Sequence, residues 1–288
     1  MPELPEVETM VRGLRPALEG RQLRFLAVHD PFLLQGCTAA ELEQVASGAR
    51  VRTVERRGKW VVLALGDRRG MIVIQPRMTG GFRLVEPDRP EHVRLTFQVD
   101  RPAQTVWFCD TRRLGKVAWY DGPDAASAAF SRSHGPDALE IASDDLASRL
   151  KRTARAIKPT LMDQKVLAGV GNIYADEILF RARLHPERPA RSLKASEVEG
   201  LHAAIGAVLS EAIAAEGSTF DGGYRTVLGL DGGFLAQNAM YGRAGEACPG
   251  CQRPVVKTKI VGLLGRPTYL CPTCQPLRRG GHRRSARS

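Results

Sequence analysis

Four cysteines toward the end of the sequence constrain the fold more than any other feature. They form two Cys-x-x-Cys pairs, Cys248/Cys251 and Cys271/Cys274. Residues 252–270, between the pairs, contain two β-like runs, VVKTKIV and PTYL, that flank a glycine-rich turn. Two such pairs on one hairpin can close a tetrahedral site around one structural Zn²⁺ ion, with no position left open for catalysis. A zinc ribbon is therefore predicted, and unrelated thiols or a redox pair are the alternative.

The remaining cysteines and the cations of the ribbon carry weaker signals. Cys37 and Cys109 are expected to be buried thiols. Lys257, Lys259 and Arg266 lie between the cysteine pairs, where there is no acidic residue. The hairpin is therefore expected to bind phosphates.

The charge of the chain indicates a polyanionic partner. The 288 residues include 42 Lys and Arg against 31 Asp and Glu, a net charge of +11, which favours nucleic acid. A membrane surface is the alternative, but no segment approaches the roughly 20 apolar residues that span a bilayer. The start, MPELPEVET, is acidic and has no apolar run, so it does not resemble a signal peptide. We expect a cytoplasmic protein, associated with the nucleoid in a bacterium.

The periodicity of apolar residues predicts a two-domain α+β protein. An apolar stripe predicts an amphipathic helix over 5–18, and the short alternating runs of 23–120 predict a β-sandwich or barrel. The stretch 121–137 is rich in Gly, Pro, Ser and Ala with few packing residues, which places a domain boundary near it. Helical patterns follow. The strongest stripe consists of Leu201, Ile205, Val208, Leu209, Ala212 and Ile213.

Three further segments have distinct expectations. A helix is predicted to begin near Asn172, a good N-cap, after the turn Ala168-Gly169-Val170-Gly171. This helix start, with basic residues before it, is a candidate clamp for a DNA backbone, although a solvated basic face is the ordinary interpretation of such charges. Those residues are Lys151, Arg152, Arg155, Lys158 and Lys165. Glycine-rich 217–234 is expected to be a mobile loop, and 276–288 a disordered basic tail.

The N-terminal residues have an ordinary and a chemical interpretation. Proline and glutamate are favoured at helix starts, which is sufficient to explain Pro2 and Glu3. However, removal of Met1 would free the secondary amine of Pro2, and an α-amino group with a pKa of roughly 7.7–8.0 is partly unprotonated at neutral pH. Pro2 could then act as a nucleophile, with Glu3 as the proton donor.

Several motifs, in order, make the chain resemble formamidopyrimidine-DNA glycosylase, more than its relative endonuclease VIII. The similarity runs from residue 2 to about 275. The motifs are PELPEVET at 2–9, RRGK at 56–59, D-x-R-R-x-G at 110–115, LMDQKVLAGVGNIYADEILF at 161–180, YGR at 241–243 and the cysteine hairpin.

This resemblance implies an architecture of consecutive parts. A β-sandwich catalytic domain with a leading helix would occupy 1–130, and a helix-two-turns-helix DNA-binding domain 131–235. The zinc-ribbon finger would occupy 236–275, followed by the tail at 276–288. DNA would lie in a basic cleft between the domains. We expect a monomer with one structural Zn²⁺ and no small-molecule cofactor, acting on damaged double-stranded DNA.

The resemblance also implies catalytic roles for particular residues. Pro2 would attack C1′ of a flipped-out damaged nucleotide, and Glu3 would protonate the sugar so that the base can leave. An iminium would then link the protein to DNA before β- and δ-elimination. Lys59 would assist the chemistry and contact a phosphate, and Glu6 would support the site. Arg266 would bind the phosphate beside the lesion and assist elimination.

The remaining implied roles are contacts with DNA. His92, Arg112 and Asn172 match DNA-binding positions of the family, and Lys158 belongs to the basic cluster described above. Met78, Leu114 and Arg112 would fill the gap left by the flipped nucleotide.

Some positions depart from the family pattern and leave the lesion preference open. The family's HLGM is Gln75-Pro76-Arg77-Met78 in this chain, so a neutral amide replaces a phosphate-binding histidine. The wedge aromatic is Leu114, Thr153 stands where lysine is common, and the zinc loop is longer than usual. Oxidised purines are the expected substrates. The alternatives are a member with shifted specificity, toward oxidised pyrimidines or abasic sites, and a non-catalytic zinc-ribbon DNA-binding protein.

Overall fold

The computed structural model describes residues 2–66, 70–100, 102–220 and 223–277, and the chain within it forms two compact units. The first comprises Met1–Asp137, Leu167–Gly169 and Leu209–Gln237. The second comprises Ala138–Val166, Val170–Val208 and Asn238–Ser288. Because the chain returns to the first unit twice, neither unit is a continuous stretch of sequence.

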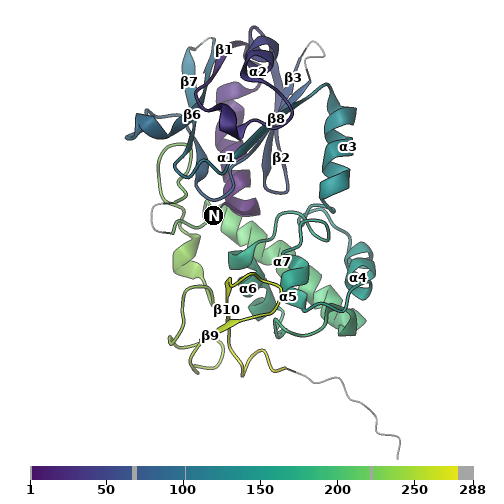
Figure 1. Ribbon diagram of the computed structural model, residues 1–288. Coiled ribbons are helices and arrows are strands. Elements are labelled where there is room, and N and C mark those ends of the chain that lie inside the picture. The colour runs from purple at the N-terminus through teal and green to yellow at the C-terminus, as the bar shows by residue number, and fades with distance from the viewer. Residues whose placement is uncertain (1, 67–69, 101, 221–222, 278–288) are drawn as a thin grey trace, which may run out of the picture. The chain divides into compact units, whose positions relative to one another are not determined.

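The first unit is built on two four-stranded antiparallel sheets (Figure 1). One has the order β1 (Leu23–Val28), β6 (Val93–Val99), β7 (Gln104–Asp110) and β5 (Gly80–Arg83). The other has the order β2 (Val51–Arg57), β3 (Trp60–Leu65), β4 (Met71–Gln75) and β8 (Lys116–Tyr120). Both sheets contribute to one core, which includes Val54, Leu63, Phe97 and Val106. The predicted α+β fold with an N-terminal sandwich is confirmed.

Helix α1 (Leu4–Leu18) also packs into this core and confirms the predicted N-terminal helix. All five residues of the predicted stripe are buried: Val7, Met10, Val11, Leu14 and Leu18. A second helix, α2 (Ala39–Ala46), follows a capping box in which Thr38 and Glu41 satisfy each other's backbone N–H groups. Short 3-10 helices occur at η1 (Pro31–Leu33), η2 (Pro90–His92) and η4 (Phe234–Gln237).

Two strands did not stand out in the sequence. Strand β2 carries charged residues at most of its outward positions, so it has no apolar run to mark it. Strand β5 begins with two glycines, which have little intrinsic preference for strands. At Gly80 a side chain is excluded, because a Cβ atom would lie 2.3 Å from the carbonyl oxygen of Pro76.

The stretch 121–137, expected to contain few packing residues, instead holds the helix α3 (Pro123–Ser133). Pro123 lies at its start, a position where the fixed φ of proline favours helix formation. Phe130 packs edge-on against Trp60, with ring centroids 5.7 Å apart. The alanine-rich composition therefore forms a helix that covers part of the sheet containing β3.

A hydrogen bond from Trp60 makes this helix end sensitive to pH. The indole Nε1–H lies 3.1 Å from Nε2 of His134 and donates to it, so the imidazole must be neutral. Burial lowers the pKa of His134, and a hydrogen bond with the backbone of Phe130 partly opposes this effect. The unfolded chain therefore takes up a proton at a higher pH than the folded chain does, and stability is lost as pH falls through the unfolded pKa of about 6.5.

We predict that urea unfolding will show this loss between about pH 7.5 and pH 5.5. The free energy of unfolding of the wild type should fall more steeply with decreasing pH than that of His134→Gln. His29→Gln, at an exposed histidine, controls for removal of an imidazole. Parallel pH profiles for the wild type and His134→Gln would contradict the assignment.

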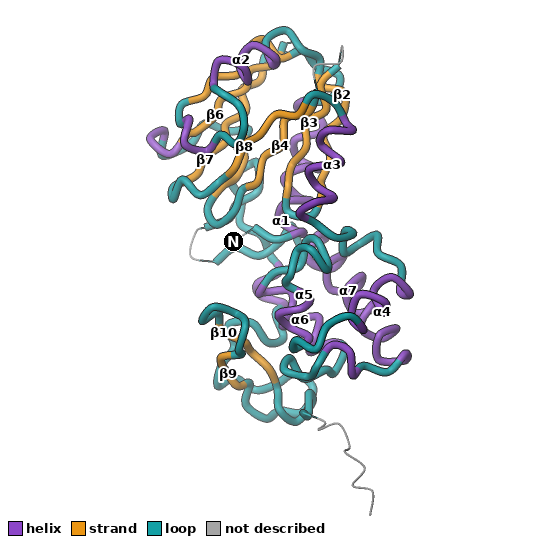
Figure 2. The backbone as a smooth tube through the Cα atoms, turned by 45° about the vertical axis from the view of Figure 1, so that its right-hand side comes forward, coloured by secondary structure: helices purple, strands orange, loops and turns teal. Residues whose placement is uncertain are grey.

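The second unit contains the remaining helices and the cysteine hairpin (Figure 2). The helices are α4 (Ser143–Lys151), α5 (Ile157–Leu161), α6 (Asn172–Arg181) and α7 (Ala195–Ala214), with η3 (Ala190–Ser192) between the last two. The predicted stripe of α7 is buried, although the part from Leu209 onward belongs to the first unit. Strands β9 (Val256–Lys259) and β10 (Pro267–Leu270) form the predicted antiparallel hairpin. In the described chain, no helix has the length and apolar character needed to cross a bilayer.

The glycine-rich segment 217–234 is irregular, as expected, but much of it is packed. Tyr224 and Val227 are buried in the core of the sandwich, and Leu84 donates a backbone hydrogen bond to Val227. The expectation of a freely mobile loop is therefore wrong for these residues, while 221–222 lie outside the described residues. The predicted disordered tail also falls mostly outside them, from 278 onward.

Candidate functional site

The first turn of α1 buries the candidate nucleophile and its carboxylate neighbours. Pro2 is buried, and Glu3 and Glu6 are each 1% exposed. The carboxylate of Glu6 accepts hydrogen bonds from the backbone N–H groups of Glu3 and Ser218, both at 2.8 Å. Gly217 allows this close packing, because a Cβ atom there would lie 2.8 Å from Oε1 of Glu6. Glu6 therefore fixes the backbone beside Pro2.

Residues 168 and 169 connect this helix start to the turn that carries Lys59. Leu4 donates a backbone hydrogen bond of 3.1 Å to Gly169, whose φ of +114° suits glycine alone. On the neighbouring residue, the Cβ atom of Ala168 lies 3.1 Å from where a Cβ atom of Gly58 would be. The segment that carries Pro2 and the turn that carries Lys59 therefore contact the neighbouring residues Gly169 and Ala168, respectively.

The turn before Lys59 is held by a buried ion-pair network. Nε of Arg56 lies 3.0 Å from a carboxylate oxygen of Glu8 on α1, and the guanidinium also pairs with Asp137. Asp137 accepts a further hydrogen bond of 3.0 Å from the backbone N–H of Gly58. This network restricts the β2–β3 turn, and Lys59 itself is half-buried.

The three predicted wedge residues lie on two loops that share one buried carboxylate. Asp110 is fully buried and accepts hydrogen bonds from the hydroxyl of Thr79 at 2.5 Å and from the backbone N–H of Gly115 at 2.7 Å. The backbone N–H of Arg112 lies 3.1 Å from Oγ1 of Thr79. This arrangement ties the loop of Met78 to that of Arg112 and Leu114. The side chains of these three residues are exposed, as a DNA-contacting role requires: Met78, Arg112 and Leu114.

Residues 75–78 lie at the end of β4 and in the turn that follows it. Gln75 is half-buried opposite Lys116 in the sheet, and Arg77 is exposed. Arg77 adopts a φ of +59°, a conformation that glycine takes at lower cost. The cation of Arg77 is therefore held on a strained turn beside Met78.

His92 is the last residue of η2, immediately before β6. Its Nδ1 atom is 3.5 Å from the hydroxyl of Thr111. Both residues line a hollow of about 620 Å³, together with three arginines. Cys109 also lines it and is half-buried rather than fully buried, as is Cys37, and burial raises the pKa of both thiols.

In the second unit, Lys158 is placed where a phosphate contact is excluded in this structure. Its side chain is 0% exposed and its ammonium lies 2.8 Å from a carboxylate oxygen of Asp176. The same ammonium donates to the carbonyl of Pro267 and to the hydroxyl of Thr268, at 3.1 and 3.0 Å. The expectation of a DNA contact fails because these internal partners bury the charge.

We predict that Lys158→Met will lower the free energy of unfolding by about 3–5 kcal/mol, because it leaves a buried carboxylate without its counter-charge. Removing Asp176 as well, in Lys158→Met with Asp176→Leu, should restore part of the loss. Lys151→Met, at an exposed lysine, is the matched control. A Lys158→Met protein of normal stability whose DNA affinity has become less salt-dependent would support the phosphate contact instead.

Asn172 is the first residue of α6 and not its N-cap. The N-cap is Gly171, which has no side chain that could cap the helix. The predicted cap fails because the amide of Asn172 is turned to the hairpin, where Nδ2 donates to the carbonyl of Pro267 at 3.1 Å. Asn172 and Lys158 thus hold the same carbonyl group, which directly follows Arg266. Arg266 itself is exposed. The helix start positions this arginine's turn, and its own first-turn side chains are buried.

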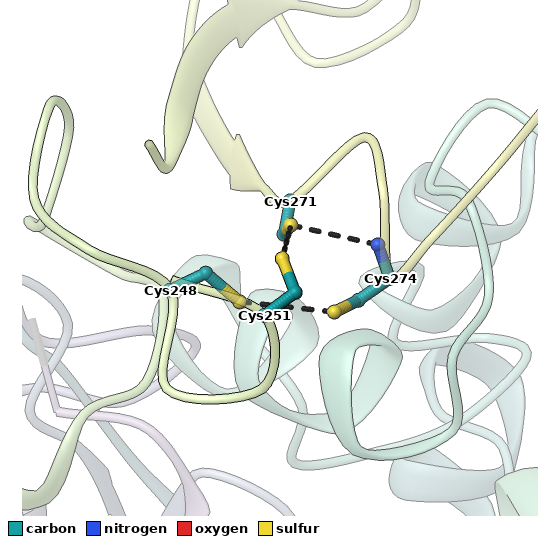
Figure 3. A group of neighbouring side chains, drawn as sticks. All are labelled: Cys248, Cys251, Cys271 and Cys274. Atoms are coloured by element: carbon teal, nitrogen blue, oxygen red, sulfur yellow. Dashed lines mark hydrogen bonds between the residues drawn. The ribbon is translucent and has the colours of Figure 1, made fainter. Parts of the chain in front are cut away.

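The four predicted ligands converge as drawn in Figure 3. The Sγ atoms of Cys248, Cys251, Cys271 and Cys274 all lie within 4.8 Å of one another. The Sγ atoms of Cys248 and Cys274 are 3.8 Å apart, and those of Cys251 and Cys271 are 3.4 Å apart. A tetrahedral ion with Zn–S bonds of about 2.3 Å places its sulfurs roughly 3.8 Å apart, so this set of thiols fits a closed zinc site.

The chain entering the hairpin is anchored by Glu177, which the sequence did not single out. Its buried carboxylate accepts three backbone hydrogen bonds of 2.7–3.0 Å, from residues 239–241. Burial raises the pKa of Glu177, and these three bonds oppose the rise. The sequence also contained no indication of the structural roles of three other carboxylates, those of Asp110, Asp137 and Asp176. Asp110 could have been noticed, because it is the first residue of the motif D-x-R-R-x-G.

A sandwich with a leading helix, joined to a helical unit that ends in a four-cysteine hairpin, defines a class shared with known proteins. Residues 1–117 match the formamidopyrimidine-DNA glycosylase N-terminal domain, and residues 134–222 match the formamidopyrimidine-DNA glycosylase H2TH domain. The chain belongs to the formamidopyrimidine-DNA glycosylase family.

Individual relatives match over almost their whole length. Formamidopyrimidine-DNA glycosylase of Thermus thermophilus is 43% identical over 96% of this chain and 98% of its own. The enzyme of Laribacter hongkongensis is 40% identical over 96% of this chain and 100% of its own. The crystal structure of MutM (Fpg) from Thermus thermophilus matches with a TM-score of 0.83, 42% identity and coverage of 95% and 98%. Lactococcus lactis Fpg, in complex with DNA that contains an abasic site, matches with a TM-score of 0.85, 28% identity and coverage of 96% and 100%.

Proposed function

We propose that this protein is a DNA glycosylase and abasic-site lyase that removes oxidised purines, such as 8-oxoguanine and formamidopyrimidines, from double-stranded DNA. The observation that carries the proposal is the full-length family match combined with Pro2, Glu3 and Glu6 at a buried helix start. In this proposal, 1–130 is the catalytic domain, 131–235 the helix-two-turns-helix domain and 236–275 the zinc ribbon. The relatives' names and the DNA in the Lactococcus lactis complex support the substrate class.

The proposed chemistry begins at the amine of Pro2. Its nitrogen bonds to C1′ while the bond from C1′ to the damaged base breaks and the base leaves with the electron pair. Glu3 then gives a proton to the ring oxygen, the sugar opens, and the nitrogen loses its proton to become an iminium. Loss of a 2′ proton and of the 3′ phosphate is β-elimination, and loss of the 4′ proton and of the 5′ phosphate is the δ-elimination that follows. Hydrolysis of the iminium frees the enzyme.

The other candidate residues serve this chemistry by holding DNA. Lys59 and Arg266 are assigned to phosphates near the lesion, and His92 and Arg112 to the flanking duplex. Met78 and Leu114 fill the space left by the flipped nucleotide, because apolar side chains offset part of the unstacking cost. Asn172 acts through the turn of Arg266, and a Zn²⁺ ion on the four cysteines holds the hairpin that presents it.

The test is reduction with borohydride in the presence of duplex that contains 8-oxoguanine. A covalent protein–DNA adduct is expected, and proteolysis with mass spectrometry should locate the sugar on the Pro2 nitrogen. Absence of an adduct with a protein that releases the base would overturn the iminium, and an adduct at another residue would overturn Pro2.

A second candidate function is the same chemistry on oxidised pyrimidines or pre-formed abasic sites. The departures at Gln75 and Leu114, and Arg77 on its strained turn, favour it. Rates measured on a panel of lesions, each opposite all four bases, distinguish the two candidates. If the protein binds such duplexes but releases no base and cuts no strand, the non-catalytic zinc-ribbon alternative gains support.

A further inference from the structure

The tip of the zinc-ribbon hairpin, residues 260–265, exposes two aliphatic side chains almost completely. Val261 is 93% exposed and Leu264 is 97% exposed, the highest values among the large hydrophobic residues that the structure describes. Their neighbours Ile260 and Leu263 are only 6% and 5% exposed. The tip is therefore anchored by one apolar pair and directs the other pair outward.

The backbone of the tip is a defined turn with an unfavourable residue in it. Leu263 and Arg266 donate backbone hydrogen bonds to Ile260 and Leu263, at 3.4 and 3.0 Å. Leu264 has a φ of +48°, which glycine or asparagine adopts more easily than leucine. Because its side chain is exposed, the leucine also gains no burial energy within this chain. Neither the geometry nor the stability of the turn accounts for leucine, whereas a contact with another molecule would.

The charge around the tip identifies the kind of molecule. Lys257, Lys259 and Arg266 are exposed on the same hairpin, and the sequence has no acidic residue after Glu246. The two lysines also line a hollow of about 470 Å³, together with Thr258, Gly265 and Pro267. An apolar tip above a cationic base complements a duplex, whose phosphates are anionic and whose sugars and base edges are partly apolar.

We propose that Val261 and Leu264 make a non-ionic contact with the DNA duplex, while Lys257 and Lys259 bind its phosphates. The proposal rests on the proposed function, because it takes damaged DNA as the partner. It adds a second apolar element to the wedge residues, at the tip of the zinc-ribbon hairpin. Apolar side chains that enter a groove add affinity that salt does not screen.

Salt dependence separates the two parts of this contact. The double variant Val261→Ser with Leu264→Asn should bind a duplex that contains an abasic-site analogue about tenfold more weakly at every salt concentration, with an unchanged slope of log K against log salt. Lys257→Met with Lys259→Met should instead reduce the slope by about 0.9 for each phosphate that is no longer bound. The asparagine suits the left-handed φ, so the thermal stability of the first variant should not fall.

Leu139→Asn, at a leucine that is 37% exposed outside the hairpin, is the control and should bind like the wild type. Wild-type affinity of the tip variant at all salt concentrations would overturn the proposal, and so would a defect that disappears at high salt. Vesicles of anionic phospholipid test the other partner: binding that the tip variant loses, with unchanged DNA affinity, would assign the tip to a membrane. If the wild type binds no duplex at all, the proposed function fails rather than this inference alone.

Discussion

A form of the protein that retains one residue ahead of Pro2 is expected to lose base release and strand cleavage by at least about a thousandfold. In that form the Pro2 nitrogen is an amide, which has no nucleophilic electron pair and cannot become an iminium. The buried side chains of Glu3 and Glu6 beside it are carboxylates, which cannot form an iminium in its place. Single-turnover rates on a lesion-bearing duplex, with the N-terminus confirmed by intact mass, measure the effect.

DNA binding should change far less than the rate, because the amine is one contact among many. Pro16→Ala removes an exposed proline from the same helix and should leave the rate unchanged. A capped protein that still reacts at the wild-type rate would exclude Pro2 as the nucleophile, and the reaction would then require another amine.

Removal of the metal should have the second-largest effect. We expect one Zn²⁺ per chain and, after chelation, a loss of DNA affinity of at least about a hundredfold, because a four-thiolate site supplies most of the folding energy of a small hairpin. The hairpin presents Arg266 and its cations only when β9 and β10 are paired. Metal analysis, binding assays and hydrogen exchange of residues 240–277 follow the change together.

Cys271→Ser should reproduce the effect of chelation, whereas Cys37→Ser, a free cysteine outside the cluster, should not. Exchange protection of the sandwich should persist in both. A metal-free protein that keeps its DNA affinity would show that the hairpin folds without zinc or that it does not contact DNA.

Local patterns allowed some elements to be predicted, and long-range contacts determined the others. The stripe of α1 and the spacing of the four cysteines are properties of short segments, so the sequence alone was sufficient. Helix α2 could also have been found, because Thr38 and Glu41 form a capping box visible in the sequence. Strand β5, in contrast, depends on glycines that accommodate a neighbouring loop.

The candidate site residues also show this difference between local patterns and long-range contacts. Lys158 looked like one member of a basic cluster because the sequence reveals a charge and not its burial. Its partner Asp176 lies on the next helix along the chain, and only the fold brings the two together. The support of Glu6 by Ser218 is equally invisible, because those residues are separated by most of the chain.

That last contact has a consequence for biosynthesis. Residues 209–237 supply the amide that holds Glu6 and the aromatic and valine side chains that complete the sandwich interior. A ribosome must therefore translate past this segment before Glu6, near the end of the chain that is made first, can acquire its final support. If Pro2 is the nucleophile, as proposed above, the surroundings of its nitrogen should therefore become ordered only late in synthesis.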